Sequence, residues 1–73
     1  MPGFTQAYDA ALYAEYLFRI KSYSSDDATF VAVETFNARE ELVKAERTRL
    51  TIISDLDIAA QAQLSCHKHG IIP

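Results

Sequence analysis

The sequence contains few residues that break regular structure or cross-link a chain. Of its 73 residues, two are glycine, two are proline and one is cysteine. A single cysteine excludes an internal disulfide and indicates a reducing compartment. The glycines and prolines all lie near a terminus, at positions 2, 3, 70 and 73. The middle of the chain therefore favours long regular elements over many short strands.

Long apolar runs and blocks of positive charge are also missing. No span approaches the ~18 apolar residues of a membrane helix, and the start, Met1 to Phe4, has no basic region leading into an apolar run. The net charge is −3, and the seven basic residues form no unbroken block. We therefore expect one cytoplasmic domain over residues 1–73, with neither a nucleic-acid nor a membrane partner.

Bulky apolar side chains are scarce. Hydrophobic residues make up 49% of the chain, but eleven of them are alanine, which favours helix while burying little area. A chain of this length buries only ~60% of its unfolded surface and is marginally stable. Its stability must come from good helix packing, a metal or another chain.

A first helix is predicted over residues 5 to 22, with Thr5 as its N-cap. Phe18 and Ala14 lie away from its main apolar stripe, so this helix either sits between neighbours or presents a second face to a partner. The stripe itself, at spacings of three and four, consists of Leu12, Tyr13, Tyr16, Leu17 and Ile20.

A second helix is predicted over residues 26 to 52, where Ser24 and Asp27 have the spacing of a capping box. Residues 29–36 are rich in β-branched and aromatic side chains and could instead form a strand, but they do not alternate as a strand would. Asn37 and Glu40 offer a later helix start. We favour one continuous helix over these alternatives.

A thin apolar seam runs along this second helix. Phe36, Val43 and Leu50 are spaced by seven, while the intermediate Arg39 and Glu46 are charged. Such a seam suits packing across another helix or against a second copy. Favourable intrahelical pairs are expected between Glu40 and Lys44 and between Glu46 and Arg49.

A third helix is predicted over residues 54 to 69. Ser54 and Asp57 repeat the capping-box spacing, and Gly70 with Ile71 is typical of a helix end. The predicted fold is all-α, with a long central helix: a three-helix bundle, or a helical hairpin with a third helix at the C-terminus.

The only cysteine and the only two histidines lie together in the stretch Cys66 to His69. Cys66 and His69 face the same way on a helix, but a structural zinc site needs four ligands, so Asp55, Asp57 or a second chain would have to complete it. A buried cysteine and helix-end cations explain the cluster more simply. A thiolate is also disfavoured near a helix C-terminus, so we predict no metal, no cofactor and no catalytic cysteine.

Charged clusters give no better indication of catalysis or nucleic-acid binding. Paired carboxylates at 26–27, 40–41 and 55/57 are explained by helix starts and a solvated face. A chain this short can hardly form a substrate pocket of ~300 Å³, so we predict neither an enzyme nor a small-molecule substrate. Acidic residues are interleaved with the basic ones, which indicates a salt-bridged exposed face formed by Arg39, Lys44, Arg47 and Arg49.

The tyrosines are the remaining indication of function. All four lie in the first third of the chain. Tyrosine is enriched where proteins meet, although the edge of a core would serve it equally well. We predict a non-catalytic protein–protein interaction module, an adaptor or accessory subunit of a larger bacterial or phage-type assembly, which self-associates. The predicted partner-binding residues are Tyr8, Tyr13, Tyr16, Phe18, Phe36, Val43 and Leu50.

Two alternatives remain open. One is a small acidic inhibitor of the anti-defence type, which would occlude the basic site of a partner. Its acidic residues would be Asp26, Asp27, Glu34, Glu40 and Glu41. The other is a metal site between chains at Cys66 and His69.

Overall fold

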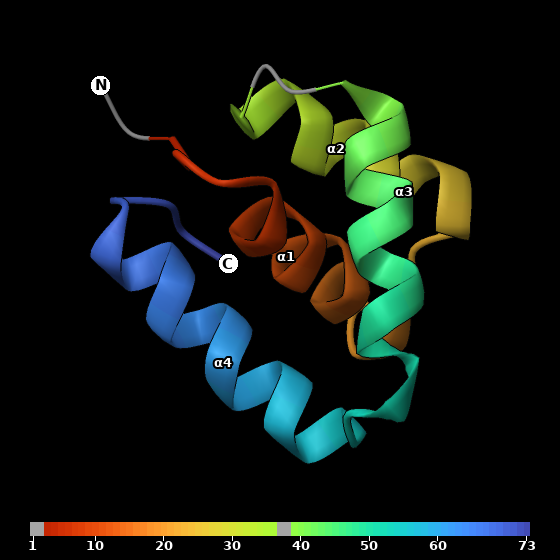
Figure 1. Cartoon of the computed structure of the whole chain (residues 1–73). Coiled ribbons are helices and arrows are strands. Elements are labelled where there is room, and N and C mark those ends of the chain that lie inside the picture. The colour runs from red at the N-terminus through yellow and green to blue at the C-terminus, as the bar shows by residue number, and fades with distance from the viewer. Residues whose placement is uncertain (1–2, 37–38) are drawn as a thin grey trace.

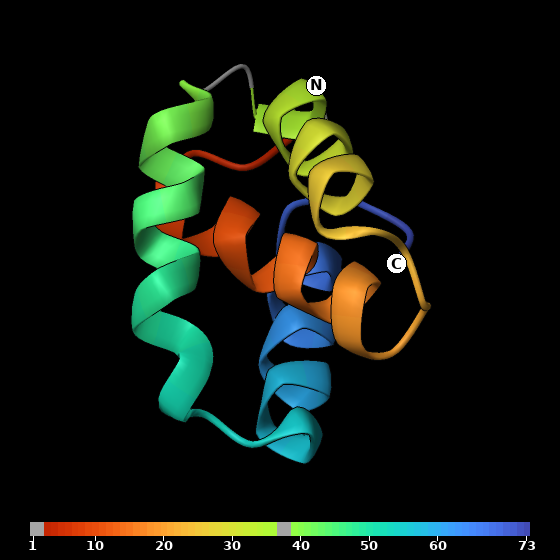
Figure 2. The same ribbon diagram turned by 90° about the vertical axis from the view of Figure 1, so that its right-hand side faces the viewer.

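The computed structural model describes residues 3–36 and 39–73 and confirms the all-α fold class. These residues form four α-helices, and a single 3₁₀ turn, Leu50–Ile52, lies between the last two. The helices are α1 (Ala7–Arg19), α2 (Ser25–Phe36), α3 (Glu40–Arg49) and α4 (Asp55–Lys68). Figure 1 shows α1 between the other helices, with α2 and α3 on one side of it and α4 on the other, and Figure 2 shows α2 above α1 with α3 beside them.

The first helix is the centre of the structure. It packs against α2, α3 and α4, and eight consecutive residues, 10–17, are buried. Ala10, Ala11 and Ala14 are fully excluded from solvent, and such small side chains let neighbouring helices approach closely. Of the two explanations for the extra apolar residues of this helix, placement between neighbours is therefore the correct one.

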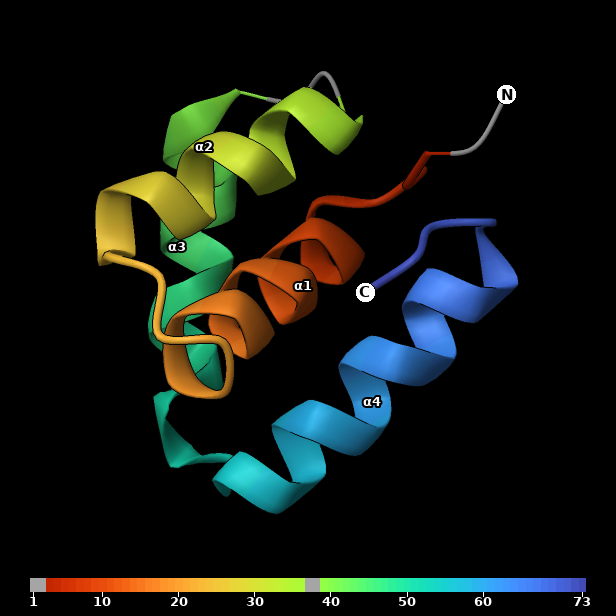
Figure 3. The same ribbon diagram turned by 180° about the vertical axis from the view of Figure 1, so that it is seen from behind.

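The predicted long central helix is wrong, because residues 26–52 form two helices. The second of these helices, α3, begins at Glu40 with Arg39 as N-cap, while Asn37, the other residue of the predicted later start, lies outside the described residues. A straight helix of that length would measure about 40 Å, whereas the longest extent of the molecule is 30 Å. Two shorter helices of different direction can both lie against α1, as Figure 3 shows. Residues 29–36 are helical, so the strand alternative is wrong as well.

Three of the predicted helix ends are confirmed: the N-caps Ser24 and Ser54, described here, and the stop at Gly70, described below. The backbone N–H of Asp27 donates to Ser24 Oγ (3.1 Å), and that of Asp57 donates to Ser54 Oγ (3.2 Å), which confirms both N-caps. The predicted cap at Thr5 is wrong: α1 begins at Ala7, and its N-cap residue, Gln6, makes no side-chain capping hydrogen bond.

The C-terminal end of α4 is the left-handed glycine motif that its sequence predicts. Gly70 has φ of 73°. The N–H of Ile71 donates to the carbonyl of Cys66 (2.8 Å), and that of Gly70 donates to the carbonyl of His67 (3.3 Å). Ile71 also packs against the core, so both ends of α4 are fixed.

Val43, Leu50 and Ile58 are the largest aliphatic side chains that are fully buried. Val43 and Leu50 are the second and third residues of the predicted seam, and they are part of the same buried cluster as Leu12, Tyr16 and Leu17 of α1. The seam thus packs against the chain's own helix. In the part of the chain that the structure describes, no helix is long and apolar enough to span a membrane.

Burial predicts that substitution of two aliphatic residues of the 3₁₀ turn lowers the free energy of unfolding by very different amounts. Leu50 is 1% exposed and Ile52 is 92% exposed. We expect Leu50→Ala to lower the free energy of unfolding by about 2–5 kcal/mol, because it leaves a cavity in the core. Ile52→Ala should change it by no more than about 0.5 kcal/mol. Urea unfolding followed by circular dichroism measures both, and equal losses would contradict the described packing.

Candidate functional site

A buried carboxylate lies at the junction of the first three helices. Glu15, on α1, accepts a hydrogen bond from Arg47 Nε through Oε1 (2.6 Å) and from Arg19 Nε through Oε2 (2.8 Å). The exposed fractions of the three side chains are only 7% for Glu15, 9% for Arg47 and 14% for Arg19. Both carboxylate oxygens are therefore engaged by cations in a place that water hardly reaches.

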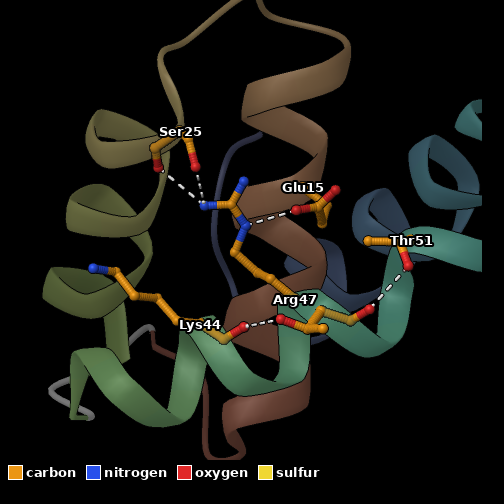
Figure 4. Close-up of a pocket in the computed structure, with 6 residues that line it drawn as sticks. Glu15, Ser25, Lys44, Arg47 and Thr51 are labelled. Atoms are coloured by element: carbon orange, nitrogen blue, oxygen red, sulfur yellow. Dashed lines mark hydrogen bonds and ion pairs between the residues drawn. The ribbon is translucent and has the colours of Figure 1, made fainter.

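Arg47 joins α3 to the other two helices. Its Nη1 donates to the carbonyl of Ser25 (3.0 Å), to Ser25 Oγ (3.2 Å) and to Thr29 Oγ1, all on α2. Figure 4 shows the guanidinium between Ser25 and Glu15. The guanidinium also lies 5.5 Å from the centre of the Phe18 ring, at the distance of a cation–π contact. One side chain thus links α1, α2 and α3.

Arg19 extends the same set of contacts toward α4. Its Nη1 donates to the carbonyl of Ile53 (2.6 Å) and its Nη2 to the carbonyl of Leu50 (3.1 Å). Nη1 also lies 3.3 Å from Asp55 Oδ1, at the start of α4. Arg19 therefore satisfies main-chain carbonyls of the 3₁₀ turn and fixes where α4 begins.

An open hollow of about 280 Å³ lies beside Arg47. Its volume is close to the ~300 Å³ of a substrate pocket, which we did not expect from a chain this short. Figure 4 shows its lining, which is Glu15, Ser25, Lys44, Arg47, Thr48 and Thr51. The hydroxyls of Thr48 and Thr51 donate to main-chain carbonyls one turn earlier (3.1 and 3.0 Å). Beside this hollow, both oxygens of the Glu15 carboxylate accept hydrogen bonds from arginine side chains.

The sequence interpretation placed Arg47 on an exposed salt-bridged face, and this was wrong. The signal that would have located it is its spacing, four residues after Val43 and three before Leu50, both of which are buried. Arg47 thus belongs to the apolar stripe of α3. The expected pairs on the exposed side are present: Lys44 Nζ lies 2.9 Å from Glu40 Oε1, and Arg49 Nη1 lies 3.7 Å from Glu46 Oε1.

We expect Glu15→Gln to lower the free energy of unfolding by about 3–5 kcal/mol, because it leaves two buried guanidinium groups without an anion. Glu40→Gln is the matched control, since it breaks the exposed pair with Lys44 and should cost no more than about 0.5 kcal/mol. Chemical denaturation of both variants measures the difference. Similar losses of unfolding free energy for the two variants would show that the buried pairs of Glu15 stabilise the fold no more than the exposed pair does.

Four of the seven predicted partner-binding residues are turned inward. Tyr13, Tyr16, Val43 and Leu50 are all at most 8% exposed and pack within the chain's own core. In the single chain these side chains face the core, because α1 lies between the other helices and the seam faces α1. The central position of α1 and the inward-facing seam thus place in the core the apolar residues that we predicted to contact a partner.

The other three predicted residues are placed differently. Tyr8 and Phe18 are 40% and 43% exposed, and Phe18 is partly covered by Arg47. The side chain of Phe36 lies outside what the structure describes.

A line of exposed apolar side chains lies on α4, whereas the other exposed apolar residues, such as Phe30 on α2 (61%) and Ile52 (92%), lie on other segments. Leu56 is 81% exposed and Leu64 is 72% exposed, and Ala60, midway between them, is exposed as well. At 3.6 residues per turn these three residues fall within an arc of about 80°. The opposite side of α4, with Ile58, is buried against α1. We call Leu56, Ala60 and Leu64 the α4 outer face; its signal in the sequence was their regular spacing of four.

Cys66 and His69 occupy different environments. Cys66 is fully buried, and its burial, aided by the negative charge of Asp9, raises the pKa of the thiol to about 11. His69 Nε2 lies 3.5 Å from Asp9 Oδ2, and its ring packs edge-on against Phe4 with ring centres 5.7 Å apart. Within residues 3–36 and 39–73, no three His, Cys, Asp or Glu side chains lie close enough together to hold a metal ion.

The raised pKa of Cys66 predicts a loss of stability in alkaline solution. The folded thiol keeps its proton up to about pH 11, whereas an exposed thiol ionises near pH 8.5. The unfolded state therefore binds fewer protons over roughly pH 8.5–11, and the free energy of unfolding falls as the pH rises through that window, by about 3 kcal/mol. Burial raises the pKa of Tyr13 too, which adds a loss in the same direction.

Cys66→Ala should remove the Cys66 part of this loss and keep the part of the Tyr13 contribution that comes from burial, which is the largest cause of the raised pKa of Tyr13. Urea unfolding at several pH values between neutral and about pH 11 measures both proteins over the window in question. Identical pH profiles for the two would show that the thiol does not contribute.

Comparison of the chain with protein-family models, with curated proteins and with solved structures finds no match in any of the three. The function must therefore be argued from the geometry of the chain's own residues.

Proposed function

We propose that the chain is a non-catalytic protein–protein interaction module, acting in the cytoplasm as an adaptor or accessory subunit of a larger assembly. Its binding surface is the α4 outer face. The observation that carries this proposal is the line of exposed apolar side chains formed by Leu56, Ala60 and Leu64. Aligned leucines on one helix face are a common way for a protein to offer an apolar contact to a partner.

The contacts that fix α4 to the rest of the chain favour this proposal. Its inner face is anchored by Ile58 and Cys66, which are fully buried. Its first turn is capped by Ser54 and contacted by Arg19 through Asp55, and its last turn is closed by Gly70. A helix held at both ends and along one side loses little conformational freedom on binding, so more of the contact energy appears as affinity.

The acidic-inhibitor alternative has weaker support. Lys44 lies among the acidic residues assigned to such a site, and its pKa is raised first by the hydrogen bond with Glu40 and then by the charges of Glu40, Asp26 and Glu41. The carboxylates of α2 and α3 thus surround a cation that offsets part of their field. A surface meant to occlude a basic site would gain from having no such cation.

The test compares one substitution at two exposed leucines. Leu64 lies on the α4 outer face, and Leu42, which is 52% exposed, lies on α3. We expect Leu64→Lys to abolish retention of a partner protein from an extract of the native host, because a charge then faces an apolar contact. Leu42→Lys should leave retention unchanged. The retained protein is then purified and its affinity for the three chains is measured by titration calorimetry.

Both substitutions are at solvent-exposed positions, so both variants should keep the helical circular dichroism of the original chain. Equal retention by all three chains would mean that the α4 outer face is not the binding surface. Loss of retention only with charge reversal at Asp26, Asp27 and Glu41 would favour the inhibitor alternative instead.

A further inference from the structure

We infer that the partner of the α4 outer face is a second copy of the same chain, with the two α4 helices packed antiparallel about a two-fold axis near Ala60. This inference rests on the proposed function and names its partner. It is carried by two observations together: the exposed apolar line on α4, and the placement of two charges along one edge of that line.

The apolar line is self-complementary. Leu56 and Leu64 are each four residues from Ala60, so in an antiparallel pair that crosses at Ala60 each leucine meets the other leucine of the second copy. The alanine at the crossing point has the smallest side chain of the three, which lets the two helix axes approach closely. Both leucines would then be covered on both copies at once.

The charges along α4 are arranged for the same pairing. Its first turn carries acidic residues and its last turn basic ones. Asp57 and Lys68 lie on the same edge of the apolar line, about 20° apart around the helix. Among the described residues neither has an ion-pair partner within the chain, whereas Asp55 already pairs with Arg19.

Antiparallel packing brings the same edges of the two helices together, as it does in antiparallel coiled coils. Asp57 of one copy then lies about 7.5 Å along the axis from Lys68 of the other, a separation that the two side chains span together. The contact occurs twice, once on each side of the axis. A parallel pair would bring opposite edges of the two helices together, so Asp57 and Lys68 of one copy would not meet those of the other; only the antiparallel arrangement joins the opposite charges.

The second copy can reach this face. Figures 1 and 3 show α4 at the margin of the molecule, with α1 on one side of it and the other helices beyond α1. One face of a 14-residue helix buries less area than the ~1,200 Å² of a standard interface. We therefore expect a weak, reversible dimer whose population rises with concentration.

Sedimentation equilibrium of the full chain at increasing concentration tests this inference. The mass should rise from 8.2 kDa toward twice that value. Leu64→Lys should keep the mass at that of the monomer, and Leu42→Lys should behave as the original chain. A mass that stays at 8.2 kDa up to about 1 mM would overturn the inference, and so would a dimer that persists with Leu64→Lys.

A charge exchange tests the antiparallel arrangement. Asp57→Lys alone and Lys68→Asp alone should each weaken the dimer about tenfold, because each places like charges together, while the double variant should restore most of the affinity. Circular dichroism at each concentration controls for loss of helix. Single and double variants that weaken the dimer additively would overturn the antiparallel pairing.

The self-pairing and the proposed function can fail separately. A chain that stays monomeric but loses a host protein with Leu64→Lys and not with Leu42→Lys would disprove the self-pairing alone. A dimer that Leu64→Lys does not affect, together with unchanged retention of host proteins, would disprove both.

Discussion

The position of Glu15 between two arginines is the constraint on which the arrangement of the helices depends. Its carboxylate is bound by Arg47 from α3 and by Arg19 from its own helix, and those arginines in turn bind the start of α2 and the turn before α4. Buried ion pairs add little net stability compared with apolar residues of the same shape, but an unpaired buried charge is costly. A packing that did not bring Arg19 and Arg47 to Glu15 would leave a buried charge without a partner, so this cluster disfavours such packings of an alanine-rich chain.

This constraint also decides which surface stays open. Because α1 is covered by α2 and α3 on one side and by α4 on the other, all of its tyrosines and leucines except Tyr8 lie in the chain's own core. Arg19 holds the 3₁₀ turn and Asp55, which sets the position from which α4 crosses α1. With Ile58 facing inward, Leu56 and Leu64 must face outward. The proposed binding surface is thus a geometric consequence of how the core is closed.

Local signals predicted three of the helix ends but not the start of α1, and the packing could be predicted only in part. The caps at Ser24 and Ser54 and the stop at Gly70 depend on a few neighbouring residues, so their sequence patterns suffice. The break between α2 and α3 follows instead from the need of both to contact a short α1. Arg47 lies 32 residues from Glu15, and nothing in its local sequence except its place in the apolar stripe indicates a buried partner. The residues of the α4 outer face could be recognised in the sequence by their spacing of four. The sequence did not indicate that they face away from the core.

The most direct test of the account is to follow backbone amide chemical shifts by nuclear magnetic resonance as the protein concentration is raised. The account predicts concentration-dependent shifts at Leu56, Ala60 and Leu64, with little change at Leu42 on α3 or at the buried Glu15. Shifts confined to α2 and α3, or no shifts at any concentration, would contradict the assignment of the α4 outer face as the surface where a second copy binds.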